Sequence, residues 1–226
     1  GMWVGTYFGG LNYYHPLKSC FQNIRYMSER NSLNDNVITC IIEDKQKGLW
    51  IGTNGGGVNH YNKETNTFTH YTQKEGLGSN DLKTIYIDET KNLVYIGTHA
   101  GGISILHRHS KRIETYNSNI KHAYSIVPAN NGDLWISTLD SIVRFNPHKK
   151  TFITYATDQD KKAIKTNHIT TIFRDSEQHL WLCGEKGIST YIEIGDELKS
   201  ILLLPEGSSV NHNFINSIYE SHNGLF

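Results

Sequence analysis

Long hydrophobic runs and cysteines are scarce in this sequence of 226 residues. No apolar run is longer than four residues, as at 201–204, whereas a membrane-spanning helix needs about 18 or more. We therefore expect no direct membrane insertion by this segment. The cysteines Cys20, Cys40 and Cys183 are odd in number and imply no disulfide framework. We expect them to be isolated thiols in or near the core.

An excess of charge of either sign is also absent. Lys and Arg together number 22, and so do Asp and Glu. The electrostatic attraction that drives binding to nucleic acids or to anionic membranes is therefore missing. No secretory signal opens the chain, and residues 1–3 already match the middle of a motif that recurs at 48–50. We therefore expect the sequence to be a piece of a longer protein.

What the sequence does contain is a repeated β-hairpin pattern. In LWIGTNGGGVNHY (49–61), Trp50 and Ile51 open a strand, the glycines at 55–57 supply a turn, and Val58 begins the return strand. The pattern recurs at intervals of 40 to 47 residues, and we call its first aromatic residues the anchors: Trp3, Trp50, Tyr95, Trp135 and Trp181. A repeat of this length that consists of strands is typical of β-propeller blades.

Each hairpin lies between two further predicted strands. An apolar strand precedes the second to fifth hairpins, at 36–44, 80–88, 123–129 and 167–175, and a further one occurs at 213–221; a strand of alternating polarity follows the hairpin. We expect the first strand to be buried on both faces and the last to have one solvated face. The predicted fold class is all-β, a β-propeller of four-stranded antiparallel blades with about five blade repeats. The expected blade units are 36–72, 80–117, 122–156, 167–205, and 1–30 combined with 213–226.

Three aspartates end the predicted first strands, at Asp44, Asp88 and Asp175. A turn follows each of them, and aspartate side chains commonly accept hydrogen bonds from turn amides. We expect this structural role for them rather than a catalytic one.

Two stretches, LWIGTNGGGVNHYNKETNTFTHY (49–71) and VYIGTHAGGISILHRHSKRIETY (94–116), resemble the two-component regulator propeller repeat. That repeat occurs in the sensor regions of hybrid two-component systems from gut Bacteroidetes. The likeness is weaker in the last two repeats, where Ser137 and Cys183 replace a glycine. The resemblance implies an arc of a larger propeller, and the alternative is a closed five-bladed ring. It also implies a periplasmic location, further blades and signalling domains in the same parent chain, and a kinase core outside this chain.

The resemblance further implies a non-catalytic sensor that recognises an oligosaccharide. We expect the hairpin tips and the connections between blades to emerge on one face, where the tip side chains vary while the framework does not. The candidate ligand-binding residues on the tips are Tyr7, Phe8, Asn54, His99, Asp140, Glu185 and Lys186. The anchors Trp50, Trp135 and Trp181 keep a fixed place in the repeat, which favours packing between blades over sugar stacking.

Two other functions remain open. One is a structural or dimerisation propeller without its own ligand, and the other is a propeller lyase or hydrolase. An enzyme of that kind needs acids or histidines gathered at the propeller axis, and no pair of acids stands out. His107 and His109 have strand spacing, but no third metal ligand is close in sequence. We expect no enzymatic activity, no metal, no cofactor and no nucleic-acid partner, while a homodimer remains open.

Overall fold

The computed structural model describes residues 1–15, 22–28, 31–117, 120–139, 141–156, 168–185, 187–194, 197–201, 215, 217–221 and 224–225. Within these ranges the regular secondary structure consists of strands, and no helix is long and apolar enough to cross a membrane. The chain divides into two compact units, Gly1–His122 and Ala123–Phe226.

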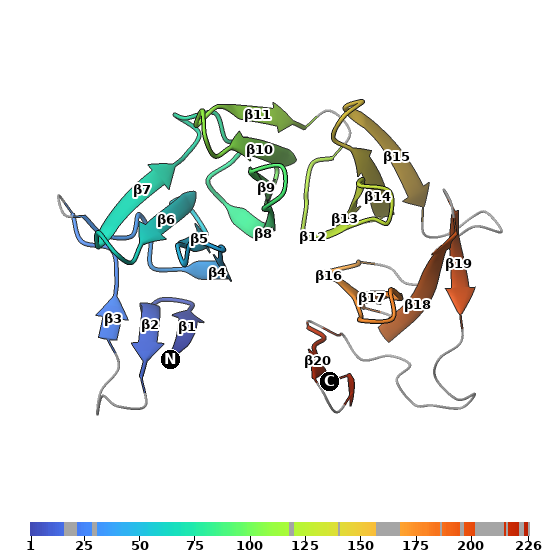
Figure 1. Cartoon of the computed structure of the whole chain (residues 1–226), viewed down its shortest axis with the longest axis horizontal. Coiled ribbons are helices and arrows are strands. Elements are labelled where there is room, and N and C mark those ends of the chain that lie inside the picture. The colour runs from blue at the N-terminus through green and yellow to red at the C-terminus, as the bar shows by residue number, and fades with distance from the viewer. Residues whose placement is uncertain are drawn as a thin grey trace. The chain divides into compact units, whose positions relative to one another are not determined.

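The first unit holds three antiparallel sheets, which follow one another along the chain (Figure 1). Their strands are β1 (Met2–Thr6), β2 (Gly10–Tyr14) and β3 (Gln22–Ile24); β4 (Ile38–Glu43), β5 (Leu49–Thr53), β6 (Val58–Asn62) and β7 (Thr67–Tyr71); and β8 (Leu82–Asp88), β9 (Leu93–Thr98), β10 (Ile103–His107) and β11 (Ile113–Tyr116). Strand order within each sheet follows the chain, so consecutive strands pair as hairpins. Neighbouring sheets touch, because β4 contacts both β1 and β8.

The second unit repeats this plan. Its strands are β12 (Ser125–Pro128), β13 (Leu134–Ser137), β14 (Ser141–Asn146) and β15 (Thr151–Ala156); β16 (Thr171–Arg174), β17 (Leu180–Gly184), β18 (Gly187–Ile194) and β19 (Glu197–Ile201); and β20 (Glu220–Ser221) and β21 (Gly224–Leu225). The last two strands pair with each other. The sheet β12–β15 packs on β16 through β12 and β13.

The anchor aromatics lie on the most buried strands. β5, β9, β13 and β17 are second in their sheets and have a hydrogen-bonded strand on each side. The exposed fractions of Trp50, Trp135 and Trp181 are 2%, 0% and 5%. Trp50 shares one core cluster with Leu82 and Val94 of the following sheet. The prediction that the anchor tryptophans pack between blades is confirmed for Trp50 and for Trp135, which clusters with Ile172 and Leu180 of the following sheet.

The first and the last strand of the sheet β4–β7 differ in the exposure of their residues. In β7 the residues Thr67 and Thr69 are exposed while Tyr71 is buried, which confirms one solvated face on the last strand. In β4, by contrast, every residue is half-buried except the exposed Glu43, so the expected burial of the first strand on both faces is wrong. The residues of β4 contact β1 and β8 of the neighbouring sheets, and this contact leaves them half-buried.

A threonine and a glycine shape each hairpin tip of the first unit. The Thr53 hydroxyl donates to the Gly57 carbonyl at 2.9 Å, and Thr6 and Thr98 repeat this bond with the glycines four residues later. Gly57 has φ +75°, a conformation that glycine adopts without strain. Its N–H donates at 3.0 Å to the carbonyl of Asn80, on the connection to the next sheet. The tips and the connections therefore lie together, as predicted.

Two cysteines are inert parts of the packing. Cys183 is fully buried, and Cys40 lies against Gly52 of the neighbouring strand. Burial raises the pKa of both thiols to about 11, so little thiolate forms at neutral pH. Their predicted place in or near the core is confirmed, while Cys20 lies outside the described residues.

Candidate functional site

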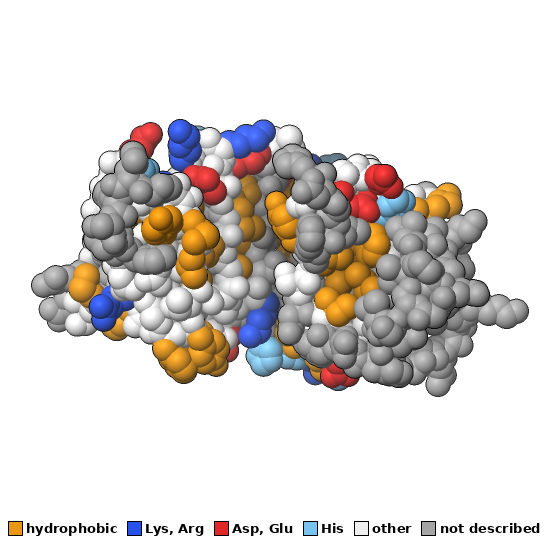
Figure 2. Space-filling model, turned by 90° about the horizontal axis from the view of Figure 1, so that it is seen from below, with side chains coloured by type: hydrophobic (Ala, Val, Ile, Leu, Met, Phe, Trp, Pro, Cys, Tyr) orange, Lys and Arg blue, Asp and Glu red, His pale blue; other side chains and the backbone are white. Residues whose placement is uncertain are grey.

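The first hairpin tip presents two exposed aromatic rings. Tyr7 and Phe8 have exposed fractions of 68% and 77%, and their ring centroids lie 4.5 Å apart in an edge-to-face contact. On the face drawn in Figure 2, exposed hydrophobic side chains form several separate patches between charged groups. The Tyr7–Phe8 pair offers an apolar surface of the size of a sugar ring or of a small protein contact.

The tips of the hairpins β5–β6 and β9–β10 both bond to Asp81, on the connection between β7 and β8. Asn54 forms an isolated antiparallel bridge with Asp81, and the His99 N–H donates to the Asp81 carbonyl at 2.8 Å. The side chains of Asn54 and His99 are exposed, and the His99 ring lies 4.5 Å from that of His122. The structure thus brings two of the predicted tip residues to either side of Asp81.

In the second unit, one predicted tip residue already has a partner. Glu185 lies 2.6 Å from the His168 Nδ1 atom, and both side chains are partly exposed. The other predicted residues there, Asp140 and Lys186, lie outside the described residues.

A cavity of about 550 Å³ opens beside the second tip, and we call it the tip cavity. Gly55 and Gly56 form one wall, whereas the predicted residue Asn54 next to them is not part of the lining. The remaining walls come from the start of the sheet and from the connection after β7, including Asn34, His70, Gln73, Lys74 and Asn80. The sequence pattern indicated the hairpin tip as the ligand-binding element, but the connection after β7 supplies most of the polar groups of this cavity.

That connection is held in shape by its own hydrogen bonds. The Thr72 hydroxyl and N–H both donate to Glu75 Oε2 at 2.7 Å, and the Gln73 N–H donates to the Asn80 side chain at 2.9 Å. The hydrogen bond from Thr72, which outweighs the opposing effect of burial, lowers the pKa of Glu75. The polar wall of the tip cavity is therefore preorganised.

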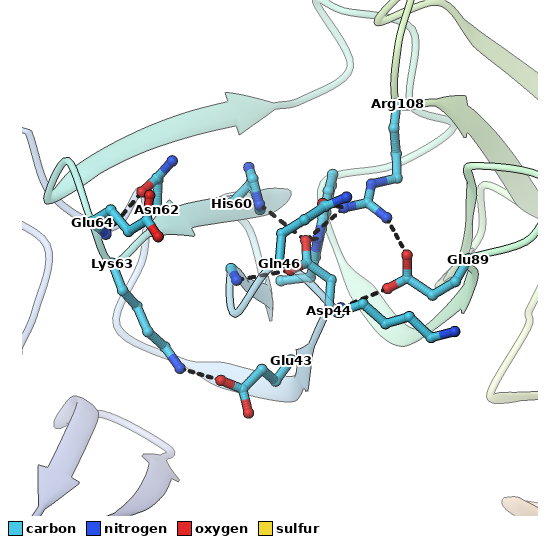
Figure 3. A network of polar contacts seen from close by, with 12 residues as sticks. Glu43, Asp44, Gln46, His60, Asn62, Lys63, Glu64, Glu89 and Arg108 are labelled. Carbon is cyan, nitrogen blue, oxygen red and sulfur yellow. Dashed lines mark hydrogen bonds and ion pairs between the residues drawn. The ribbon is translucent and has the colours of Figure 1, made fainter.

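A polar network lies at the opposite ends of the strands (Figure 3). The Asp44 carboxylate accepts from the Gly48 N–H at 2.8 Å and from the Trp50 indole N–H at 2.9 Å. Its side chain is only 1% exposed, and Arg108 of the following sheet lies 2.7 Å from it. Burial alone would raise the pKa of Asp44, but the bonds from Trp50 and Gly48 and the charge of Arg108 lower it. The carboxylate therefore stays ionised and structural.

Arg108 joins two adjacent sheets. Besides Asp44, its guanidinium binds Gln46 of the sheet β4–β7 and lies 2.7 Å from Glu89 of its own sheet. Glu89 also accepts from the Lys45 N–H at 2.9 Å. We call these five residues the Arg108 clasp. At the same place of the repeat, Lys63 pairs with the exposed Glu43 and Glu193 pairs with Arg174, so the clasp itself is not readable from the repeat pattern.

In the sheet β16–β19, Asp175 has the place in the repeat that Asp44 has in the sheet β4–β7. Asp175 accepts from the His179 N–H at 2.7 Å and from the Trp181 indole N–H at 2.7 Å. Arg174 pairs with Glu193 at 2.7 Å and also donates to the Pro128 carbonyl of the preceding sheet. Asp88 likewise accepts from turn amides after β8, so the predicted structural role of all three aspartates is confirmed.

The sheet β12–β15 departs from this pattern. Ala129 stands six residues before its anchor, where Asp44 and Asp175 stand before theirs. The indole N–H of the buried Trp135 has no hydrogen-bond partner among the described residues. The nearby carboxylate, Asp133, instead binds Arg144 at 2.7 Å.

The carboxylates of these networks already accept hydrogen bonds from backbone N–H, indole and guanidinium groups. Over the described part of the chain, no three or more His, Cys, Asp and Glu side chains lie close enough to hold a metal ion. The arrangement offers hydrogen-bonding and stacking surfaces.

The tandem antiparallel sheets with buried anchor strands define a β-propeller fold, which confirms the predicted fold class. Residues 32–55, which contain β4 and β5, match the family described as "Two component regulator propeller". The resemblance inferred from the repeats is confirmed over these residues. A comparison with curated protein sequences finds no match.

Solved structures of similar fold include two extracellular domains of hybrid two component systems from B. thetaiotaomicron. They superpose with TM-scores of 0.80 and 0.76 at 24% identity, covering 99% of this chain and 30% and 31% of theirs. PorZ, a surface component of the type-IX secretion system of Porphyromonas gingivalis, superposes with a TM-score of 0.70 at 15% identity, over 99% of this chain and 36% of its own. These likenesses establish the fold, and the chain spans about a third of each of these relatives.

Proposed function

We propose that this chain is the non-catalytic, periplasmic ligand-sensing portion of a hybrid two-component regulator. It recognises an oligosaccharide in the tip cavity and signals to a kinase that lies outside the chain. Further blades of the same parent chain extend it into a larger propeller. The matched family and the extracellular domains of similar fold support this role.

The tip cavity is the observation that carries the proposal. Its walls combine amides, hydroxyls and backbone groups, which are the partners that sugar hydroxyls need. Lys74 and Glu75 contribute one charge of each sign, so the lining favours a hydroxyl-rich ligand over a strongly charged one. The exposed Tyr7–Phe8 pair provides a stacking surface on another tip.

Titration calorimetry of the full-length parent protein against plant, host and microbial oligosaccharides tests the proposal. The double variant Gln73→Ala and Lys74→Ala removes two side chains of the cavity wall and spares the Thr72–Glu75 bonds. We expect it to lose at least about tenfold in affinity, as for the loss of two polar contacts.

Lys149→Ala is the matched control, because Lys149 is exposed in the turn between β14 and β15 and lines neither this cavity nor another one described here. It should bind like the wild type. Absence of binding across the whole panel, or equal binding by the double variant, would contradict sugar recognition in this cavity.

A dimerisation role is the second candidate, and the exposure of Tyr7 and Phe8 favours it. Replacing both residues with serine should then turn a dimer into a monomer in sedimentation experiments. A wild-type protein that stays monomeric at high concentration would rule this role out.

A further inference from the structure

A second cavity, of about 380 Å³, opens between the sheets β4–β7 and β8–β11. We call it the clasp cavity, because the Arg108 clasp borders it. Gln46, Asn92 and Lys111 of its lining belong to the turns β4–β5, β8–β9 and β10–β11. In an antiparallel sheet these turns lie at the end opposite the β5–β6 tip, so the clasp cavity is separate from the tip cavity.

Aromatic rings form the floor of the clasp cavity. The Trp50 ring stacks on His60 at 4.2 Å and lies 6.0 Å from the nearly parallel ring of Tyr71. Trp50 and Tyr71 are 2% and 6% exposed, so only small parts of their rings face the opening. His60, whose side chain is 24% exposed, is the ring of this floor that is accessible to the C–H groups of a sugar.

The charge of the lining is of one sign. Its charged side chains are Arg108 and Lys111, with His60 and His109 beside them, and no Asp or Glu lines it among the described residues. Arg108 is already neutralised by Asp44 and Glu89 in the clasp. Burial lowers the pKa of His60, which is therefore neutral at pH 7.

Lys111 is the cation that remains for a ligand. It is exposed at the rim, in the turn between β10 and β11, and no ion pair engages its ammonium group within the described ranges. His109 stands beside it in the same turn. Lys111 offers a positive charge and His109 an imidazole beside it, above an aromatic floor, which suits a ligand with one negative charge.

Neutral donors complete the lining. Asn62 Oδ1 accepts from the N–H groups of Glu64 and Thr65, which orients its amide and leaves Nδ2 to donate. The exposed hydroxyl-bearing residues Thr67 and Thr69 of β7 line the wall next to it. These groups match the hydroxyls of a sugar, which a simple inorganic anion lacks.

We propose that the clasp cavity binds a sugar that carries a carboxylate, of the uronic acid class. Lys111 and His109 bind the carboxylate, Asn62 and the β7 threonines bind ring hydroxyls, and the aromatic floor contacts the ring. The clasp cavity is separate from the tip cavity. A negative result for one cavity therefore does not contradict ligand binding in the other.

The test is titration of the full-length parent protein with three probes: glucuronic acid, glucose and sodium acetate. Glucuronate should bind about tenfold or more tightly than either other probe, because it alone combines the charge with the hydroxyls. Equal binding of glucose would show that the carboxylate is not recognised, and equal binding of acetate would show that the sugar is not. Either result overturns the proposal.

Two variants locate the binding. Lys111→Gln should reduce glucuronate affinity about tenfold. The control is Lys150→Gln, which should leave the affinity unchanged. Lys150 has the corresponding turn position in another blade and nearly the same backbone angle, φ 57° for Lys150 and 58° for Lys111. Thr69→Trp fills the cavity without changing charge and should abolish binding, with thermal unfolding used to verify the fold. Full glucuronate affinity in both Lys111→Gln and Thr69→Trp would place the ligand elsewhere and overturn the assignment.

Discussion

Asp44 accepts the indole N–H of Trp50, six residues later, at 2.9 Å, and the pair lies buried between two sheets. The indole of an anchor tryptophan must enter the core to fill it, and its N–H would then lack water. A carboxylate at the preceding turn satisfies that N–H and, at the same time, an amide of the turn. Asp175 and Trp181 repeat the arrangement with the same spacing at 2.7 Å.

Replacing Asp44 with alanine should strongly destabilise the first unit. The change removes the acceptor of Trp50 and leaves Arg108 with one of its two carboxylate partners. Breaking a buried ion pair in this way costs about 3–5 kcal/mol. Urea unfolding followed by tryptophan fluorescence measures the loss. Glu64→Ala, in an exposed turn, should change the free energy of unfolding by less than about 0.5 kcal/mol. A similar small effect of Asp44→Ala would contradict the clasp.

Stability should fall in acid through the same carboxylate. The pKa of Asp44 is lowered in the folded state from 3.8, so the unfolded chain binds the proton more readily. The contribution is therefore fully present above the unfolded pKa and is lost as pH falls through the lower folded pKa. Unfolding free energies measured from pH 6 down to about pH 2 should decline more steeply for the wild type than for Asp44→Asn. Parallel curves would argue against an ionised Asp44.

Supplying the missing acceptor should stabilise the sheet β12–β15. In Ala129→Asp a carboxylate would stand six residues before Trp135, as Asp44 does before Trp50. We expect the free energy of unfolding to rise by about 1 kcal/mol, because a buried indole N–H gains a partner. The gain should vanish in a Trp135→Phe background. A gain that survives there would have another origin than the indole.

The second hairpin tip should tolerate no side chain at Gly57. Its φ is +75°, and a Cβ atom would lie 2.3 Å from the Tyr71 carbonyl oxygen. Gly76 also has positive φ, +113°, but a Cβ atom there would meet nothing closer than 3.4 Å. Gly76→Ala should therefore cost only the strain of its positive φ, about 1–3 kcal/mol, and Gly57→Ala clearly more. Thermal unfolding of the two variants compares them, and equal losses would dismiss the steric conflict.

Much of the fold is readable in the sequence because each blade is encoded by consecutive residues. The anchor residue, the Gly-Thr pair and the tip glycines specify one hairpin within about a dozen positions, and the repeat states it again. The turn role of Asp44 follows from the same local chemistry. The prediction that the first strand is buried on both faces is wrong for β4, because an apolar run does not reveal how fully the neighbouring sheets cover it.

The site was predicted only in part. Sequence variation pointed to Asn54 on the tip, while the cavity beside it is lined by Gly55, Gly56 and the connection that includes Gln73 and Asn80. Variation between repeats identifies positions free to change. It does not indicate which neighbouring segment folds against them.

The sequence by itself determined the repeat, the strand order within a blade and the burial of the anchors, since these depend on hydrogen bonds and hydrophobic patterns between near neighbours. Only the tertiary structure decided which residues of different blades meet. Arg108 reaches Asp44 across 64 residues of chain, and the clasp cavity lies where the sheets β4–β7 and β8–β11 pack against each other. Those contacts depend on the offset between packed sheets, which no local pattern encodes.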